Sequence, residues 1–200
     1  MPDLCLNEGE RGIAMPDELW RWSAGRIAAS IAARDISARE VVEASIARMR
    51  AVNGAINAVT VDLSERALAA ADRADAAVKR GERPGPLHGV PVTIKENVDQ
   101  AGCATTNGVV ANRDAIAHDD APVVANLLKA GAIPIGRTNT PAFSFRLDTV
   151  NDLRGRTHNP WRRSMVWMNR LASSSDSCVP VSSHACPRPI SCTSSRPWSR

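Results

Sequence analysis

Lys95 is the residue whose type and position most clearly suggest chemistry. It follows an apolar, β-branched segment, residues 90–94, with Pro91 near its start, and such a segment predicts a short strand. An amine at the end of an apolar strand is shielded from water, and desolvation lowers the pKa of a lysine. A neutral lysine amine can take a proton from a serine hydroxyl, as in the serine–lysine variants of serine catalysis. Taken alone, however, a lysine at the end of a strand is usually a solvated surface charge, so its position does not by itself assign this role.

A second group of candidate residues would suggest zinc. Cys178, Cys186 and Cys192 lie near His184, but their spacings include no close pair of the Cys-x-x-Cys type that structural zinc sites use. We therefore predict no zinc site among these residues.

The remaining reactive side chains have simpler interpretations. His88 is expected to be packed or solvated rather than catalytic. Asp119 and Asp120 are interpreted as the start of a helix, where a carboxylate is favourable, rather than as a catalytic pair. Cys5 and Cys103 lie too far apart in the sequence to indicate a disulfide framework, and a reducing cytoplasm is the expected location.

The first half of the chain predicts helices with one short strand. An amphipathic helix is expected from Trp20 to about residue 34, and Ser37 with Glu40 forms a capping box for the next helix. That helix is expected to bury a stripe at positions 42, 46 and 49 and to end at Asn53-Gly54. A short strand at residues 55–61 and an alanine-rich helix at residues 64–79, ended by Gly81, follow.

The second half predicts a strand, a helix and a strand. The strand at residues 90–94 ends at Lys95; Pro122 suits the first turn of a helix over residues 123–129, and a strand follows at residues 132–135. This order predicts an α/β fold, with helices flanking a mixed β-sheet.

Three segments resemble, in the same order, the motifs of the amidase signature family. PLHGVPVTIKEN at residues 86–97 resembles the lysine motif of that family, GAIPIGRTNTP at residues 131–141 resembles its next block, and GRTHNPW at residues 155–161 resembles the approach to its serine loop. The similarity extends from about residue 20 to residue 161.

The resemblance implies an activity and one site residue. Members of the family hydrolyse a carboxamide to a carboxylic acid and ammonia or an amine, using a triad of serine, cis-serine and lysine without metal or cofactor. Lys95 matches the lysine of the triad, so the resemblance implies that Lys95 is the general base. The expected substrate is a small-molecule amide, and the expected fold is a truncated version of the family's mixed sheet flanked by helices.

The serine loop of the family has no counterpart that we can assign. A glycine-flanked pair of serines is expected soon after residue 161, because glycines allow the backbone to turn sharply and to present amides to an oxyanion. The serine run at residues 173–175 has no flanking glycine. We therefore assign no nucleophile and expect the chain alone to be inactive.

The amino-acid composition also changes near residue 161, where the resemblance to the family ends. Residues 161–200 contain eleven serines and no glycine and carry a net charge of +5, whereas residues 1–160 carry a net charge of −1. The overall charge of +4 therefore does not indicate a nucleic-acid partner. We predict an N-terminal extension at residues 1–19, part of an amidase domain at residues 20–161, and a divergent, disordered tail rich in Ser, Arg, Pro and Cys at residues 162–200.

Both ends of the sequence suggest how the reading frame was assigned. The abrupt change after Trp161 is what a frameshift in a GC-rich gene would give, and the repeat of Met1-Pro2-Asp3 at Met15 favours Met15 as the natural start. Neither a signal peptide nor a transmembrane segment is expected.

Two other interpretations stay open. The chain could be a noncatalytic remnant or a small binding protein, which an activity assay would distinguish from an amidase. The glutamine-amidotransferase subunit that acts on misacylated transfer RNA belongs to the same family and is a lesser alternative.

Overall fold

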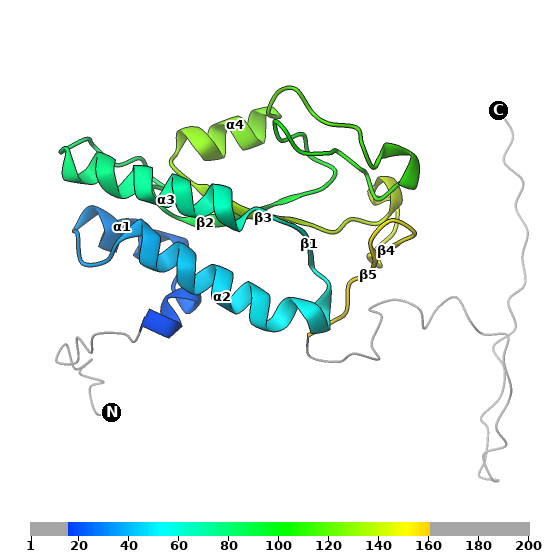
Figure 1. Cartoon of the computed structure of the whole chain (residues 1–200), viewed down its shortest axis with the longest axis horizontal. Coiled ribbons are helices and arrows are strands. Elements are labelled where there is room, and N and C mark those ends of the chain that lie inside the picture. The colour runs from blue at the N-terminus through cyan, green and yellow to red at the C-terminus, as the bar shows by residue number, and fades with distance from the viewer. Residues whose placement is uncertain (1–15, 161–200) are drawn as a thin grey trace, which may run out of the picture. The chain divides into compact units, whose positions relative to one another are not determined.

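A computed structural model describes residues 16–160, which form a small mixed sheet covered by helices (Figure 1). The sheet contains β1 (Val59–Asp62), β2 (Pro91–Lys95) and β3 (Ile133–Thr138) in the order β1-β3-β2. Strand β2 is parallel to β3, and β1 is antiparallel to it. The predicted α/β class with a mixed sheet is confirmed. Residues 1–15 and 161–200, on which the predicted start site, tail and frameshift depend, lie outside the described residues.

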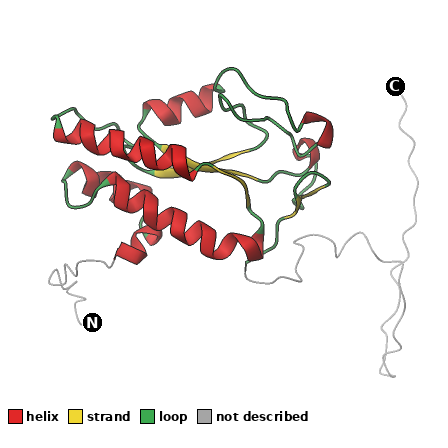
Figure 2. Ribbon diagram, viewed as in Figure 1, coloured by secondary structure: helices red, strands yellow, loops and turns green. Residues whose placement is uncertain are grey.

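Within residues 16–160, four α-helices and three short 3-10 helices surround this sheet (Figure 2). The ribbon shows the strands running between α2 on one side and α4 on the other (Figure 1). Helix α2 also packs along α3, and the 3-10 helix η1 packs against α2. The bounds are η1 (Pro16–Arg21), α1 (Ala24–Ala32), α2 (Ala38–Ile56), α3 (Ser64–Lys79), η2 (Val110–Asn112), α4 (Pro122–Lys129) and η3 (Ala142–Ser144).

The core lies between these helices and the sheet. It joins apolar side chains of α1, α2 and α3 to those at the start of β2 and along β3, among them Ile27, Ile31, Val42, Ile46, Ala71, Val90 and Ile133. Burial of such side chains is the main favourable term in folding. Leu19, which we assigned to the N-terminal extension, is buried in this core.

The first helices differ from the prediction at their ends. The chain is not one helix from Trp20, because it breaks after η1 and restarts at α1, where the Ser23 side chain caps the helix by accepting from the amide of Arg26. The capping box of Ser37 and Glu40 is confirmed. Helix α2, however, continues through Asn53-Gly54 and ends at Asn57, whose left-handed backbone forms the C-cap.

The predicted start of α4 needs a similar correction. Pro122 does occupy its first turn, but the N-cap residue is Ala121, and no side chain caps the helix. Asp120 instead accepts a hydrogen bond from the amide of Ala101, at 2.8 Å. The expectation that Asp119 and Asp120 form the start of this helix is therefore wrong, since both precede the N-cap residue and neither caps the helix.

A glycine turn connects α4 to β3 and places β3 beside β2. Gly131 has a φ of +94°, and a Cβ at this position would lie 2.8 Å from the Cα of His88. The close approach lets the Gly89 amide donate to the Gly131 carbonyl, directly before the two strands pair. Only glycine fits this turn without strain.

Candidate functional site

Lys95 is the last residue of β2, as the sequence predicted. Its side chain extends to η3, the short helix that follows β3, where the Nζ atom donates to the Oγ of Ser144 at 3.3 Å. The burial expected for Lys95 is wrong for the described residues, because its side chain is exposed. The structure therefore has an amine and a hydroxyl in contact at the carboxyl end of a parallel strand pair, which is where α/β sheets commonly bind ligands.

The Ser144 hydroxyl has two more partners. Asn97 Nδ2 donates to it at 3.1 Å, and the hydroxyl of Thr140 lies 3.0 Å away. Phe143 and Ser144 both have left-handed backbones, with φ values of 50° and 60°, a conformation that few residues other than glycine adopt. Sequence analysis missed Ser144, because the sequence around it contains no glycine to signal this turn.

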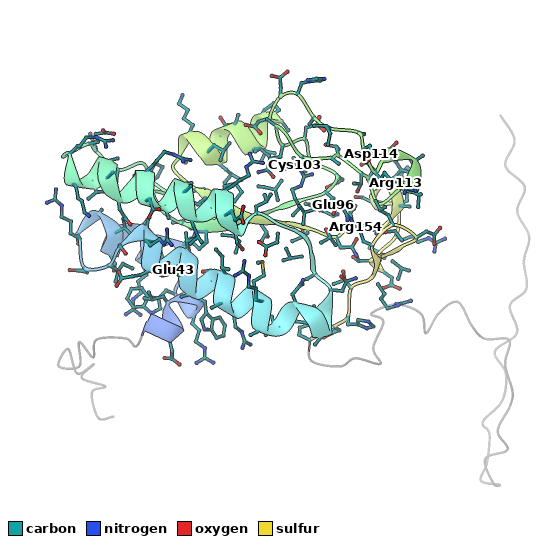
Figure 3. All side chains as sticks on the ribbon, viewed as in Figure 1. Glu43, Glu96, Cys103, Arg113, Asp114 and Arg154 are labelled. Carbon is teal, nitrogen blue, oxygen red and sulfur yellow. The ribbon has the colours of Figure 1, made fainter. Side chains whose placement is uncertain are left out.

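Glu96, the residue after Lys95, is a fully buried carboxylate. It accepts from the hydroxyls of Thr60 and Thr106 and forms an ion pair with Arg154, whose Nε lies 3.0 Å from Oε1 (Figure 3). Buried charges are tolerated where they are paired and hydrogen-bonded. Glu96 thus connects the end of β2 to β1 and to the loop that carries Arg154.

Arg137 on β3 holds the backbone on both sides of Glu96. It is fully buried, and its Nη2 donates to the carbonyls of Lys95 at 3.3 Å and Val98 at 2.9 Å. The Nε and Nη1 atoms have no hydrogen-bond partner among residues 16–160. Arg137 belongs to the motif at residues 131–141, but nothing in the sequence indicated this role.

Buried asparagines attach the last described segment to the same site. Asn151, on the hairpin of β4 (Val150–Asn151) and β5 (Gly155–Arg156), donates to Asn139 Oδ1 and to the Thr140 carbonyl, both at 2.7 Å. Asn139 in turn donates to Thr157 Oγ1 at 3.1 Å. The chain approaching Pro160 is thereby fixed next to the loop that carries Ser144.

The other candidate residues lie apart from Lys95 or outside the described residues. His88 makes a structural contact, with Nε2 3.1 Å from the Ala74 carbonyl. Cys103 is a buried free thiol. In residues 16–160 no group of three or more His, Cys, Asp or Glu side chains could hold a metal ion, and the cysteines from 178 onward with His184 are not described.

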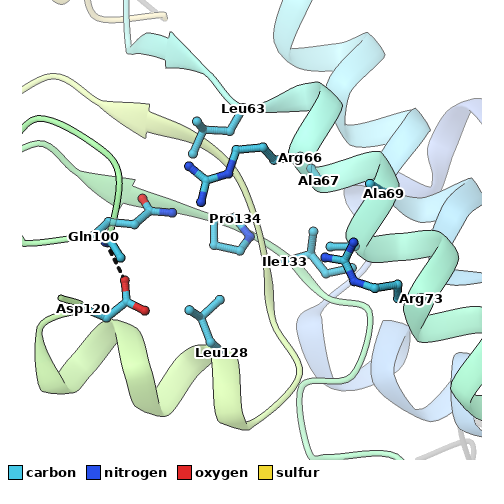
Figure 4. Close-up of a pocket in the computed structure, with 12 residues that line it drawn as sticks. Leu63, Arg66, Ala67, Ala69, Arg73, Gln100, Asp120, Leu128, Ile133 and Pro134 are labelled. Carbon is cyan, nitrogen blue, oxygen red and sulfur yellow. Dashed lines mark hydrogen bonds between the residues drawn. The ribbon is translucent and has the colours of Figure 1, made fainter. Parts of the chain in front are cut away.

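A separate pocket of about 320 Å³ lies between α3 and α4 (Figure 4). Arg66 and Arg73 of α3 form one wall, Asp120 and Leu128 contribute to the opposite wall, and Gln100 closes one end. Lys95 does not line this pocket, so the hollow and the candidate site are different features. No helix in the described part of the chain has the length and hydropathy needed to cross a membrane.

Comparison with known families gives one match that covers most of the chain. A family model described as Amidase matches residues 40–188. This range continues beyond residue 161, so the predicted boundary between domain and tail stays a prediction.

Three curated relatives are similar over about the same part of the chain. The indoleacetamide hydrolase of Bradyrhizobium diazoefficiens is 60% identical over 143 residues, which are 72% of this chain and 27% of the relative. The acylamidase of Rhodococcus erythropolis is 41% identical over 149 residues (74% and 31%). A glutamyl-tRNA(Gln) amidotransferase subunit of Carboxydothermus hydrogenoformans is 41% identical over 144 residues (72% and 30%). The chain thus spans about 30% of the length of these relatives.

A solved structure gives the same result for the fold. A bacterial aryl acylamidase of the amidase signature family matches with a TM-score of 0.68 and 29% identity, over 71% of this chain and 30% of that one. The sheet and helices described above therefore correspond to one part of a larger fold.

Proposed function

Because the chain belongs to the amidase family, we propose that it is the part of an amide hydrolase that supplies the lysine of a serine–serine–lysine proton relay, and that this lysine is Lys95. The reaction converts a carboxamide and water into a carboxylic acid and ammonia or an amine. The observation that carries the proposal is the position of Lys95 at the carboxyl end of β2, in a segment that resembles the lysine motif of the family and in contact with a hydroxyl.

The role proposed for Lys95 is proton transfer. Once neutral, the amine takes the proton of the nucleophilic serine through the second serine of the relay, while the serine oxygen attacks the amide carbonyl. The same proton then goes to the leaving nitrogen, so that the C–N bond breaks and ammonia or an amine departs. Water releases the acyl group in the reverse sequence. Neither serine of the relay has an assigned position in this sequence, so we expect the 200-residue chain by itself to release no ammonia.

The similarity figures favour a hydrolase of a small amide. Identity is 60% with the indoleacetamide hydrolase and 41% with the amidotransferase subunit. Indoleacetamide is therefore the first substrate to test. We also infer a cytoplasmic location, because the spacing of Cys5 and Cys103 indicates no disulfide framework.

A chimaera tests the proposal directly. Residues 20–160 of this chain replace the corresponding segment of the Bradyrhizobium hydrolase, and release of ammonia from indoleacetamide is measured. We expect activity, and we expect Lys95→Ala to lower kcat by a factor of about 10³ or more, as removal of a triad member does. Lys95→Arg should be equally inactive, because an arginine keeps its proton.

Lys129→Ala is the matched control, since Lys129 is an exposed lysine on α4. A folded chimaera in which Lys95→Ala is as active as Lys129→Ala would refute the proposed role. A folded chimaera without activity would instead favour the noncatalytic interpretation, and release of ammonia from glutamine alone would favour the amidotransferase.

A further inference from the structure

We propose that Ser144 is a positioning residue for Lys95: its hydroxyl holds one N–H of the lysine, so that the lone pair of the neutral amine is left free for the proton relay. This inference rests on the proposed function and adds a residue that lies outside the three motifs of the sequence. It follows from the direction of each hydrogen bond around the Ser144 hydroxyl.

A hydroxyl has two acceptor positions and one proton to donate. The amide nitrogen of Asn97 can only donate, and it does so to Ser144 Oγ at 3.1 Å. Lys95 Nζ donates to the same oxygen at 3.3 Å. Both acceptor positions of Ser144 are then in use.

The proton of Ser144 is also committed. Thr140 Oγ1 lies 3.2 Å from the Pro141 carbonyl, which can only accept, and 3.0 Å from Ser144 Oγ, where either hydroxyl can donate. We assign the Thr140 proton to the Pro141 carbonyl, so that the Thr140 oxygen accepts from Ser144. Thr140 is fully buried, which shields its bond to the Pro141 carbonyl from water, whereas the Ser144 side chain is exposed. The chain of protons therefore runs from Lys95 and Asn97 to Ser144, then to Thr140, and then to Pro141.

This order decides what Lys95 can do once it is neutral. Ser144 has no proton left to give, so it cannot occupy the lone pair of the amine. Lys95 can bind Ser144 only through an N–H group, and the lone pair then points away from Ser144. A base whose lone pair is free and whose position is fixed is ready to accept a proton.

The backbone holds Ser144 in place for this contact. The left-handed conformations of Phe143 and Ser144 are secured by two hydrogen bonds, from the Phe143 amide to the Asn107 carbonyl and from the Ser144 amide to the Pro141 carbonyl, both at 2.8 Å. Strained residues that the surroundings hold firmly are common at functional sites.

The small number of lysines makes the contact measurable in the whole 200-residue chain. Lys79, Lys95 and Lys129 are the three lysines of the sequence, so lysine labelled with ¹³C gives one Cε signal for each. Relaxation of these signals measures the order of each side chain on the ps–ns timescale. Exposed Lys79 and Lys129 serve as internal references.

We expect the Cε of Lys95 to be more ordered on the ps–ns timescale than the Cε of Lys79 and of Lys129. We expect Ser144→Ala and Ser144→Gly each to lower the order of the Lys95 Cε to that of these two references. The two variants both remove the hydroxyl but differ in backbone strain, because glycine adopts a φ of 60° freely and alanine does not. If both variants lose the same amount of order at the Lys95 Cε, the effect is due to the missing hydroxyl and not to backbone strain. The two reference signals should not change.

Two results would overturn the inference: a Lys95 side chain as mobile as Lys79 in the original chain, or a Lys95 signal that Ser144→Gly leaves unchanged. Because no turnover is measured, failure here would leave the proposed function untouched, whereas an active Lys95→Ala chimaera would remove the function but not the contact.

Discussion

At the scale of single residues, the site depends most on a charge that is hidden from water. Glu96 is fully buried next to Lys95, with Arg154 and two threonine hydroxyls as partners. Removing one member of such a group leaves the others desolvated and unpaired, which costs more than the intact group contributes. Lys95 therefore precedes, in the chain, a residue whose substitution is expected to destabilise the fold.

Substitution of Glu96 tests this view. We expect Glu96→Ala to lower the free energy of unfolding by about 3–5 kcal/mol, because it leaves Arg154 without its partner. Glu96→Gln, which keeps hydrogen-bonding capacity, should cost less. Urea denaturation followed by tryptophan fluorescence measures both.

The control for this test is Glu43, which forms an exposed pair with Arg39 on α2. Glu43→Ala should cost at most about 1 kcal/mol, as for other surface pairs. Equal effects of Glu96→Ala and Glu43→Ala would contradict the account of Glu96.

At the scale of elements, the start of α2 is set by a capping box, which is local in sequence and contains a titratable carboxylate. Glu40 accepts from the backbone amide and the hydroxyl of Ser37, while the Ser37 hydroxyl accepts from the Glu40 amide. The hydrogen bond from the Ser37 backbone, followed by the one from its hydroxyl, holds the pKa of Glu40 below its ordinary value of 4.5. A carboxylate with a lowered pKa stabilises the fold above the ordinary value, and this contribution disappears as the pH falls through the folded value.

Because of the capping box, we expect Glu40→Ala to lower the stability of the fold by an amount that depends on pH. The variant should be less stable than the original chain by about 1 kcal/mol near neutral pH, and the difference should shrink as the pH falls below the ordinary value of 4.5 and through the lower folded value. Thermal unfolding at several pH values measures it. Ser23→Ala, which removes the cap of α1 without removing a titratable group, should give a difference that does not vary with pH. A Glu40→Ala effect that persists unchanged after the carboxyl group is protonated would argue against the box.

At the scale of the whole molecule, large apolar side chains are exposed next to the site. Phe143, Phe145 and Leu147 have 53%, 87% and 79% of their surface accessible. The rings of Phe143 and Phe145 are in contact, with their centres 6.1 Å apart. Contiguous apolar surface of this kind favours association.

We therefore predict that the chain is poorly soluble and self-associates. The double variant Phe145→Ser with Leu147→Ser should lower the apparent mass at a given concentration, measured by light scattering over a dilution series. Val123→Ser, at an exposed apolar position on α4, should have little effect. A monodisperse original chain that melts cooperatively would contradict the prediction.

Much of the architecture could be predicted because it depends on neighbours in the sequence. The capping box joins residues three apart, and the helix at residues 64–79 was predicted with its observed bounds. Pro122 in the first turn of α4 and Lys95 at the end of β2 follow from local preferences in the same way. The family resemblance added the chemical role proposed for Lys95.

Errors occurred where side-chain hydrogen bonds to residues outside the helix outweighed these preferences. The predicted stop at Asn53-Gly54 fails because the Asn53 side chain instead bonds the start of β1, accepting from the Ala58 and Val59 amides and donating to the Val59 carbonyl. Helix α2 is then free to continue to Asn57. Asp120 was misassigned for a similar reason, since its partner lies 19 residues earlier.

The sequence by itself determined the family, the order of the strands and helices, and the lysine at the end of a strand. Only the tertiary structure decided that Ser144, 49 residues from Lys95, is its hydrogen-bond partner, and that Arg154, 58 residues from Glu96, neutralises that buried carboxylate. The physical reason is range: capping and periodicity act within a few residues, whereas a contact between β2 and η3 exists only after β3 has paired with β2.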